Sequence, residues 1–291
     1  MSDLQLWISA VQIGCFFGLL ALSYYVVLAG TGFFNFAIGT YAMVGGLCAA
    51  WLVINHNYPL WPAVLIALVA TVALAAVTEV AVVRPVQRRS EGSELPALVA
   101  VTAVLFAIQQ LGGVTFGYTT LPGQNLWTFH SIHLGSSIIL PSALVLVVTT
   151  VIVFFLVAAW VRFTRTGRVL RAVGDSRESA SLLGLPVGRI RIIGFALSGL
   201  LAGTAGLLFA PKAGVSSSSG LDWALSGFLA LVVGGTASVW APLVGGLILG
   251  MLQIFIPFYF GGTSLPYLLL ILAAVFFAFR PQGLFDRRVR V

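Results

Sequence analysis

The sequence predicts an all-α polytopic membrane protein with about eight to ten transmembrane helices, and three observations lead to this fold class. Apolar residues make up 59% of the 291 residues. Charged residues make up only 8%, whereas a soluble domain carries about 25%. The apolar residues form runs that reach the roughly 20 residues with which an α-helix crosses the hydrocarbon core. So few charges cannot cover a soluble globule of this length, so soluble enzymes and soluble binding modules are excluded.

Nine apolar segments follow one another along the chain, and each is expected to form one helix. They are residues 6–29, 33–54, 60–83, 95–112, 138–161, 192–210, 223–239, 242–260 and 264–280. A membrane β-barrel is excluded, because its segments of about ten residues alternate in polarity and these segments are uniformly apolar. A broken or re-entrant segment in the first 60 residues would change the number of crossings by one. Residues 1–291 are treated as a single transmembrane domain.

The arginines fall in three blocks, at residues 84–89, 162–191 and 280–290. Basic residues gathered between apolar spans follow the positive-inside rule, with the lipid surface rather than nucleic acid as the nearby anion. Two predicted spans separate the first two blocks and four separate the last two, so all three blocks fit on the cytoplasmic side. Three spans before Arg84 then place the N-terminus outside and the C-terminus in the cytoplasm. Residues 1–3 lack the positive charge of a cleavable signal peptide.

Catalytic and metal-ligating patterns are not evident in the sequence. The histidines lie in predicted external loops, with no carboxylate or cysteine at ligand spacing; they are His56, His130 and His133. The serine run 216–219 has no base beside it. We therefore expect no metal site, no cofactor bound by this chain and no enzyme activity. Pairs of glycines four residues apart, Gly14/Gly18, Gly199/Gly203 and Gly246/Gly250, predict close helix packing.

The connection at about 162–191 is the most informative stretch of the chain, because it combines helical apolar spacing with charge. Its apolar residues are expected to form one patch, consisting of Val169, Leu170, Val173, Leu182 and Leu183. Its charged residues are assigned to the wet face, and they are Arg171, Asp175, Arg177 and Glu178. Gly184 and Pro186 end the pattern. An amphipathic segment of this kind lies either on the lipid surface or in a protein groove, and its acidic residues favour the groove.

Five motifs of the chain resemble those of branched-chain amino acid ABC importer permeases. Residues 167–172 (GRVLRA), with Asp175, Ala180, Leu183 and Gly184, resemble the cytoplasmic coupling loop of that family. The other four are Glu79 with 84–86 (RPV), 234–238 (GGTAS) with 245–250 (GGLILG), 280–285 (RPQGLF) and 35–37 (NFA). Together they extend over nearly the whole chain. The sequence departs from the family pattern at Ile38, where a histidine is frequent, at Ala237 and Ala241, where glycines are usual, and at Asp175-Ser176, which has one acid where two are common.

This resemblance implies the type II-like importer permease fold and a set of partners. A second permease subunit, a different chain or a copy, would complete the pathway. Two cytoplasmic ATPase subunits would use ATP, and an external solute-binding protein would deliver the substrate to a bacterial inner membrane. The chain itself contains no G-x-x-x-x-G-K-[S/T] nucleotide-binding motif. The resemblance assigns ATPase coupling to Arg168, Arg171, Asp175, Ala180, Leu182, Leu183 and Gly184.

The polar start of the second predicted span is the candidate substrate pathway, with Thr31 and Asn35 followed one turn later by Gly39 and Thr40. Glycine and asparagine permit a broken helix whose backbone amides face a zwitterionic substrate. The alternative is that Asn35 only forms a hydrogen bond within the protein. Glu79, five residues before Arg84, is interpreted as a carboxylate that reaches the membrane surface and pairs with an arginine, rather than as a proton relay.

The leading functional hypothesis is therefore a permease subunit of an ATP-driven importer. The alternative is a self-sufficient secondary transporter or channel, but ion coupling usually needs acidic residues near the membrane midplane, and only Glu79 is a candidate. Leucine, isoleucine and valine are the substrates that the resemblance implies. Urea, amides and other small polar solutes stay open, because Ile38 removes a polar group near the expected pathway and the binding protein largely sets specificity.

Overall fold

A computed structural model describes residues 3–89, 94–127, 132–134, 137–175 and 177–262. Its helices are α1 (Asp3–Thr31), α2 (Ile38–His56), α3 (Leu60–Val77), the π-helix η1 (Thr78–Val83), α4 (Arg84–Arg89), α5 (Glu94–Phe116), α6 (Pro141–Phe163), α7 (Arg165–Asp175), α8 (Arg177–Leu182), α9 (Val187–Ala213), α10 (Ser219–Gly234) and α11 (Ala241–Phe260). The strands β1 (Ile132–Leu134) and β2 (Ser137–Ile139) form a short antiparallel hairpin in which Ile132 faces Ile139.

The all-α polytopic fold class is confirmed. Among the described residues, seven helices are long and apolar enough to cross a membrane, and α10 is a shorter apolar helix. α10 has 16 residues, which extend over only about 24 Å at 1.5 Å per residue. The predicted span 223–239 is therefore shifted and shortened, because the chain turns at Gly235 with a φ of 85°. The predicted span 264–280 lies outside the described residues.

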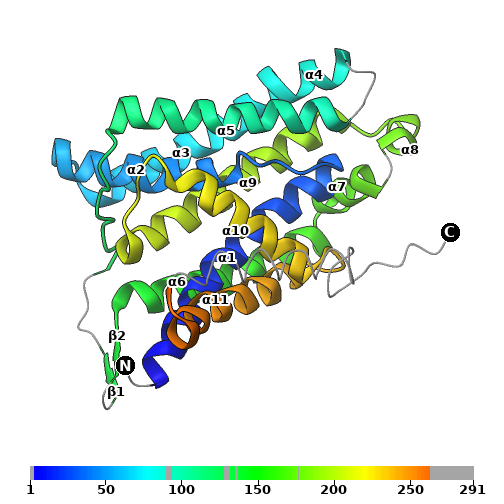
Figure 1. The fold of residues 1–291 in the computed structure, drawn as a ribbon. Coiled ribbons are helices and arrows are strands. Elements are labelled where there is room, and N and C mark those ends of the chain that lie inside the picture. Colours follow the sequence, from blue (N-terminus) through cyan, green and yellow to red (C-terminus); the bar gives the residue numbers. More distant parts are fainter. Residues whose placement is uncertain (1–2, 90–93, 128–131, 135–136, 176, 263–291) are drawn as a thin grey trace.

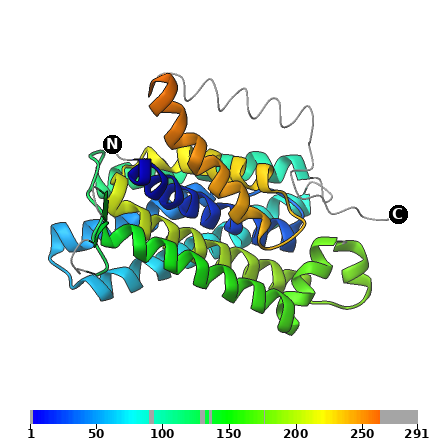
Figure 2. The same ribbon diagram turned by 90° about the horizontal axis from the view of Figure 1, so that it is seen from below.

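The two ends of the helix bundle differ in their elements. α4, α7 and α8 lie at one end, which we call the basic end, and the β1–β2 hairpin and the N-terminus lie at the opposite end, the hairpin end (Figure 1). The same separation is visible from below (Figure 2). The two described arginine blocks thus share one end, as the parity of the spans predicted. Which side of the membrane that end faces stays a prediction.

α1 lies at the centre of the bundle and packs against α9, α10 and α11. A Cβ atom on Gly246 or Gly250 of α11 would overlap the backbone of α1 at Gly18 or Gly14. Two of the predicted glycine pairs therefore face each other, and they allow the helix backbones to touch. Such contact is valuable in a membrane, where helices associate through close packing because lipid is as apolar as the protein core.

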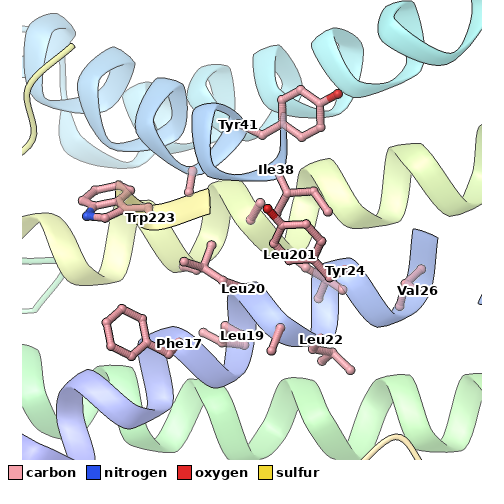
Figure 3. Packing of buried hydrophobic residues seen from close by; sticks show 14 of the residues in the cluster. Phe17, Leu19, Leu20, Leu22, Tyr24, Val26, Ile38, Tyr41, Leu201 and Trp223 are labelled. Atoms are coloured by element: carbon pink, nitrogen blue, oxygen red, sulfur yellow. The ribbon is translucent and has the colours of Figure 1, made fainter. Parts of the chain in front are cut away.

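The core around α1 is aromatic and aliphatic. The Phe16 ring stacks on Phe209 of α9 with 3.9 Å between the ring centroids. Side chains of Tyr24, Ile38 and Leu201 converge from α1, α2 and α9 (Figure 3). The Tyr24 hydroxyl donates to the Ala224 carbonyl of α10 at 2.9 Å, which satisfies this buried polar group inside the apolar core.

Two short breaks bring polar backbone into this bundle. α1 ends at Thr31 and α2 starts only at Ile38, five residues later than predicted, because residues 32–37 form an irregular segment in which Gly32 has a φ of 80°. α10 begins after the connection 214–218, and a Cβ atom on Gly220 would touch the Thr40 side chain in the first turn of α2. The N-termini of α2 and α10 therefore lie beside each other within the bundle.

Candidate functional site

The break 32–37 gathers the predicted pathway residues, but it places them differently than expected. Thr31 is the last residue of α1 rather than the start of the second span, and its hydroxyl donates to the Val27 carbonyl at 2.7 Å. A threonine that bonds back to the carbonyl four residues earlier ends its helix without an unsatisfied hydroxyl. Thr31 is half-buried and the preceding Gly30 lies against Leu170 of α7.

Asn35 is fully buried and organises the break. Its side-chain oxygen accepts a hydrogen bond from the Ala37 amide at 3.0 Å, and its side-chain amide donates to the Tyr41 hydroxyl at 3.3 Å. Thr40 is also buried and donates to the Ala37 carbonyl at 2.7 Å. Gly39 lies directly against α10 at Gly220 and Ala224. The four predicted residues thus surround one break, and the hydrogen bonds of Asn35 fix the path of the chain into α2. A pathway role for them stays a prediction.

Residues 165–184 of the connection 162–191 include the positions that the resemblance assigns to ATPase coupling, and we call them the coupling segment. The segment contains the helices α7 and α8, and its apolar residues are buried in α7 but exposed at the end of α8. Leu170 and Val173 of α7 are buried in a cluster with Ala180 of α8 and Ile190 of α9. Leu182 and Leu183 are 83% and 77% exposed. The expectation of one continuous apolar patch is therefore wrong. The reason is tertiary: α7 packs on the ends of α1, α6 and α9, so its apolar face is covered by the chain itself, whereas the end of α8 projects from the bundle.

Gly174 of α7 forms a close contact that the sequence analysis did not predict. A Cβ atom there would overlap the Ala29 carbonyl of α1. The glycine lets α7 lie directly on the last turns of α1, immediately before the break. A glycine inside an amphipathic helix can indicate a site at which another backbone approaches closely, and this signal would have predicted the contact.

Gly184 ends the coupling segment as predicted. Its φ is 70°, in the left-handed region that favours glycine, and a Cβ atom at this position would have open space around it. The Leu185 amide donates to the Ala180 carbonyl at 3.1 Å, a bond across the turn of the kind that closes a helix with a left-handed residue. Gly184 is therefore needed for its backbone conformation and not for space.

The polar residues of the segment also differ in their exposure to solvent. Arg168 is exposed, and one of its guanidinium nitrogens donates to the Phe163 carbonyl at 3.3 Å. Arg171 is half-buried, and Asp175 is the last residue of α7. The exposed part of the segment thus combines a basic α7 surface with the two leucines at the end of α8.

Glu79 is fully buried in η1 and does not reach the surface, so the expectation of a carboxylate at the membrane surface is wrong. Its principal partner is Arg191 of α9, with Nε of Arg191 2.9 Å from Oε1 and Nη2 donating to Oε2 at 3.1 Å. The expected pairing with an arginine is thus present, and Arg84 is a second, more distant partner, with Nε 4.0 Å from Oε1. Arg191 also donates to the side-chain oxygen of Gln87 in α4. Sequence reasoning had placed Arg191 in a cytoplasmic loop, whereas α9 already begins at Val187.

Comparison with known proteins bears on the identity of the chain. A family described as "Branched-chain amino acid transport system / permease component" matches residues 8–279. The high-affinity branched-chain amino acid transport system permease protein LivH of Escherichia coli K12 is 26% identical over 263 residues, which cover 86% of this chain and 84% of that protein. The corresponding protein BraD of Pseudomonas aeruginosa is 25% identical over 297 residues, covering 98% of this chain and 96% of BraD.

A match that covers only about half of the chain is to a sugar import permease. The ribose import permease protein RbsC of Haemophilus influenzae is 30% identical over 168 residues, or 53% of this chain and 51% of that protein. No solved structure matches the chain. Because the family match extends over most of the sequence and agrees with the multi-pass helical fold, the chain belongs to the branched-chain amino acid transport system permease family and is a transmembrane permease subunit of an ATP-binding-cassette importer.

Proposed function

We propose that this permease carries branched-chain amino acids, or a related small polar solute, from an external solute-binding protein across a bacterial inner membrane. Two ATPase subunits bound at the basic end supply the energy, and a second permease subunit completes the pathway. The family description and the names of LivH and BraD support the substrate class. The partial similarity to a ribose importer makes sugars the competing substrate class.

The observation that carries the coupling part of this proposal is the exposure of Leu182 and Leu183 at the basic end. Burying a leucine side chain is worth roughly 1.5–3 kcal/mol, so two adjacent leucines in water gain free energy from an apolar groove. The basic α7 surface beside them, which includes Arg168, favours a groove with an acidic rim. A cytoplasmic ATPase subunit with such a groove would take α8 as the anchoring helix end.

The packing of α7 gives this contact a route into the membrane domain. Leu170 and Val173 hold α7 to the start of α9, and Gly174 lies on the end of α1. An ATPase shifts the permease only if its contact differs in free energy between its two states. A movement of the groove would then displace α7 together with the ends of α1 and α9.

The proposed pathway segment remains Thr31, Asn35, Gly39 and Thr40. Three of these four residues are buried, so substrate contact requires that the break 32–37 opens to the pathway during transport. Its irregular backbone supplies amides and carbonyls to a zwitterionic solute once it opens. Asn35 then changes partners from Ala37 and Tyr41 to the solute.

The proposed orientation places the basic end in the cytoplasm and the N-terminus outside, and cysteine labelling tests it. Single cysteines at Arg88, Arg177 and Gln124 are exposed to an impermeant thiol reagent in intact cells. Only the Gln124 variant is expected to react, with low background because the native Cys15 and Cys48 are buried. The same outcome is expected for Arg287, which lies outside the described residues. Labelling at Arg177 would contradict both the orientation and the ATPase site.

Transport by the complete complex tests the function. The permease is reconstituted into vesicles with its partner permease, ATPases and binding protein, and uptake of labelled leucine, urea and ribose is measured with and without ATP. ATP-dependent uptake of leucine is expected. Uptake of ribose but not of leucine would show that the substrates are sugars rather than branched-chain amino acids. Gradient-driven uptake by the permease alone would favour the secondary-transporter hypothesis.

A further inference from the structure

The contact between η1 and the first turns of α9 is formed by charged groups inside the bundle. Glu79 binds Arg191 with both carboxylate oxygens, at 2.9 and 3.1 Å. Gln87 of α4 accepts from the same guanidinium, and Nη2 of Arg84 donates to the Gly188 carbonyl at 2.8 Å. Three side chains of η1 and α4 thus hold one short stretch of α9. Glu79, Gln87 and Arg191 are all buried.

A buried ion pair is not needed to hold two helices together. Removing two charges from water costs free energy, and replacing such a pair by well-packed apolar side chains is often neutral or stabilising. The pair fixes the relative orientation of the two helices, because a bidentate contact between arginine and carboxylate has one geometry. Contacts between apolar side chains allow several orientations. The pair therefore suits a position at which one helix must follow another.

On α9 the residue next to Arg191 packs against the coupling segment. Ile190 packs in the cluster with Leu170, Val173 and Ala180, which lie on α7 and α8. Neighbouring side chains of one helical turn therefore contact the coupling helices and η1. A displacement of α7 and α8 acts on Ile190, and the same turn carries Arg191 against Glu79.

On the other side, η1 approaches the break 32–37 through Tyr41 of α2. The Tyr41 hydroxyl of α2 lies near the side chain of Thr78 in η1. The Asn35 amide donates to that hydroxyl at 3.3 Å. Tyr41 lies on α2 and its ring points away from the α1 side chains (Figure 3). Arg191 is thus connected to Asn35 through Glu79, the neighbouring Thr78 of η1 and Tyr41.

We propose that Glu79 and Arg191 are a positioning pair that transmits movement of the ATPase-bound helices α7 and α8 to the break 32–37. This inference rests on the proposed function of the coupling segment. The pair touches neither nucleotide nor solute, and it acts by making η1 follow the start of α9. Loss of the pair uncouples the two regions even where the fold is intact.

The decisive variant removes both charges, because it separates a positioning role from a structural one. Glu79→Gln and Arg191→Met each leave one buried partner without its counterpart, and both are expected to reduce stability. The double variant Glu79→Leu/Arg191→Met replaces the pair by apolar side chains and is expected to assemble like the wild type. A purely structural role predicts that this double variant also recovers transport. The positioning role predicts a loss of uptake per ATP hydrolysed by roughly 2- to 30-fold, the range of coupling changes that mutations between sites produce.

The opposite end of α9 offers a matched control. Lys212 in its last turn donates to the side-chain oxygen of Gln12 in α1 at 2.8 Å. This contact also joins α9 to a neighbouring helix, but it lies far from α7 and α8 along the helix. The control Gln12→Leu/Lys212→Met is expected to leave uptake per ATP unchanged.

The experiment combines two readouts on the reconstituted complex with its ATPases and binding protein. Uptake of labelled leucine per ATP hydrolysed is measured, and amide hydrogen exchange of residues 32–41 is compared with and without ATP. In the wild type ATP is expected to change the exchange of this segment, and in the charge-free double variant it is expected not to.

The outcomes separate the two ideas. A wild type that takes up no tested solute, but whose exchange at residues 32–41 responds to ATP only with the pair present, would count against the proposed substrates and support the inference. A double variant that couples as well as the wild type would overturn the inference and leave the proposed function standing. The inference would also be overturned if ATP did not change the amide hydrogen exchange of residues 32–41 in the wild type.

Discussion

The break between α1 and α2 and the end of α8 each contain a side chain of the kind that their surroundings normally exclude. At the break a polar side chain, Asn35, is fully buried within a bundle of apolar helices. At α8 the apolar Leu183 is 77% exposed outside that bundle. The difference lies in what satisfies each group. Asn35 has its hydrogen-bond partners in Ala37 and Tyr41 of the same chain, whereas nothing in the described part of the chain covers the leucines. The break is therefore completed internally, whereas the coupling segment would be completed by the ATPase subunit that we propose.

Backbone geometry shows the same contrast. Both regions contain a glycine with positive φ, 80° at Gly32 and 70° at Gly184. At Gly184 a side chain would meet open space, while the break is packed against α10 through Gly39. Changes at Leu183 and Gly184 should therefore affect function without disturbing packing, and changes at the break should affect both.

The largest effect is expected for Leu183→Asp. The change places a charge in the proposed apolar groove, where an unpaired carboxylate is strongly unfavourable. It should abolish substrate-stimulated ATP hydrolysis in the assembled complex, measured in vesicles with the binding protein present. Insertion and pairing with the second permease should persist because Leu183 makes no core contact. Leu183→Met is the matched control, and full stimulation in the Asp variant would mean that coupling runs elsewhere.

Gly184→Val should follow closely, for a different reason. A left-handed conformation costs a non-glycine residue about 1–2 kcal/mol, and more when the side chain is β-branched. The end of α8 would change direction and most of the ATPase stimulation would be lost. Gly184→Asn is the control, since asparagine tolerates this conformation better. Equal loss in both variants would show that the glycine is required for something other than its φ.

Asn35→Leu should have a mixed effect. The variant loses the hydrogen bonds to Ala37 and Tyr41, and losses of this kind in membrane bundles average below about 1 kcal/mol. Thermal unfolding in detergent should therefore change little. Uptake should fall clearly, with insertion intact, if the break faces the solute during transport. Normal uptake with reduced stability would assign Asn35 a structural role only.

Tyr41→Phe should have the smallest effect and sharpens the previous test. It removes one hydroxyl from the contact between Asn35 and η1 but leaves the bond from the Ala37 amide to Asn35 in place. The loss of stability is expected to stay below about 1 kcal/mol and to be smaller than in Asn35→Leu, because only one of the two hydrogen bonds is lost. Uptake should fall less than in Asn35→Leu. A larger loss of uptake in Tyr41→Phe would move the important polar group from the asparagine to the tyrosine.

The sequence alone determined the features that depend on composition and local chemistry. Long apolar runs with few charges require transmembrane helices because the bilayer leaves backbone groups no other partners. Gly32 and Asn35 indicated a broken helix, and Gly184 with Pro186 indicated the end of the coupling segment. Each of these follows from residues that are close together in the chain.

Only the tertiary structure decided which faces of the helices meet. Lipid and protein core are both apolar, so a uniformly apolar helix does not reveal its packed side. In the amphipathic coupling segment the spacing shows an apolar face, but it does not say which of these residues the chain itself covers. The sequence therefore could not distinguish the buried Leu170 from the exposed Leu183, or recognise Gly174 as the contact with α1. It paired Glu79 with an arginine but could not identify Arg191 as the closer of the two that surround it, because Arg191 is 112 residues away and is brought to the carboxylate by the packing of α9 against η1.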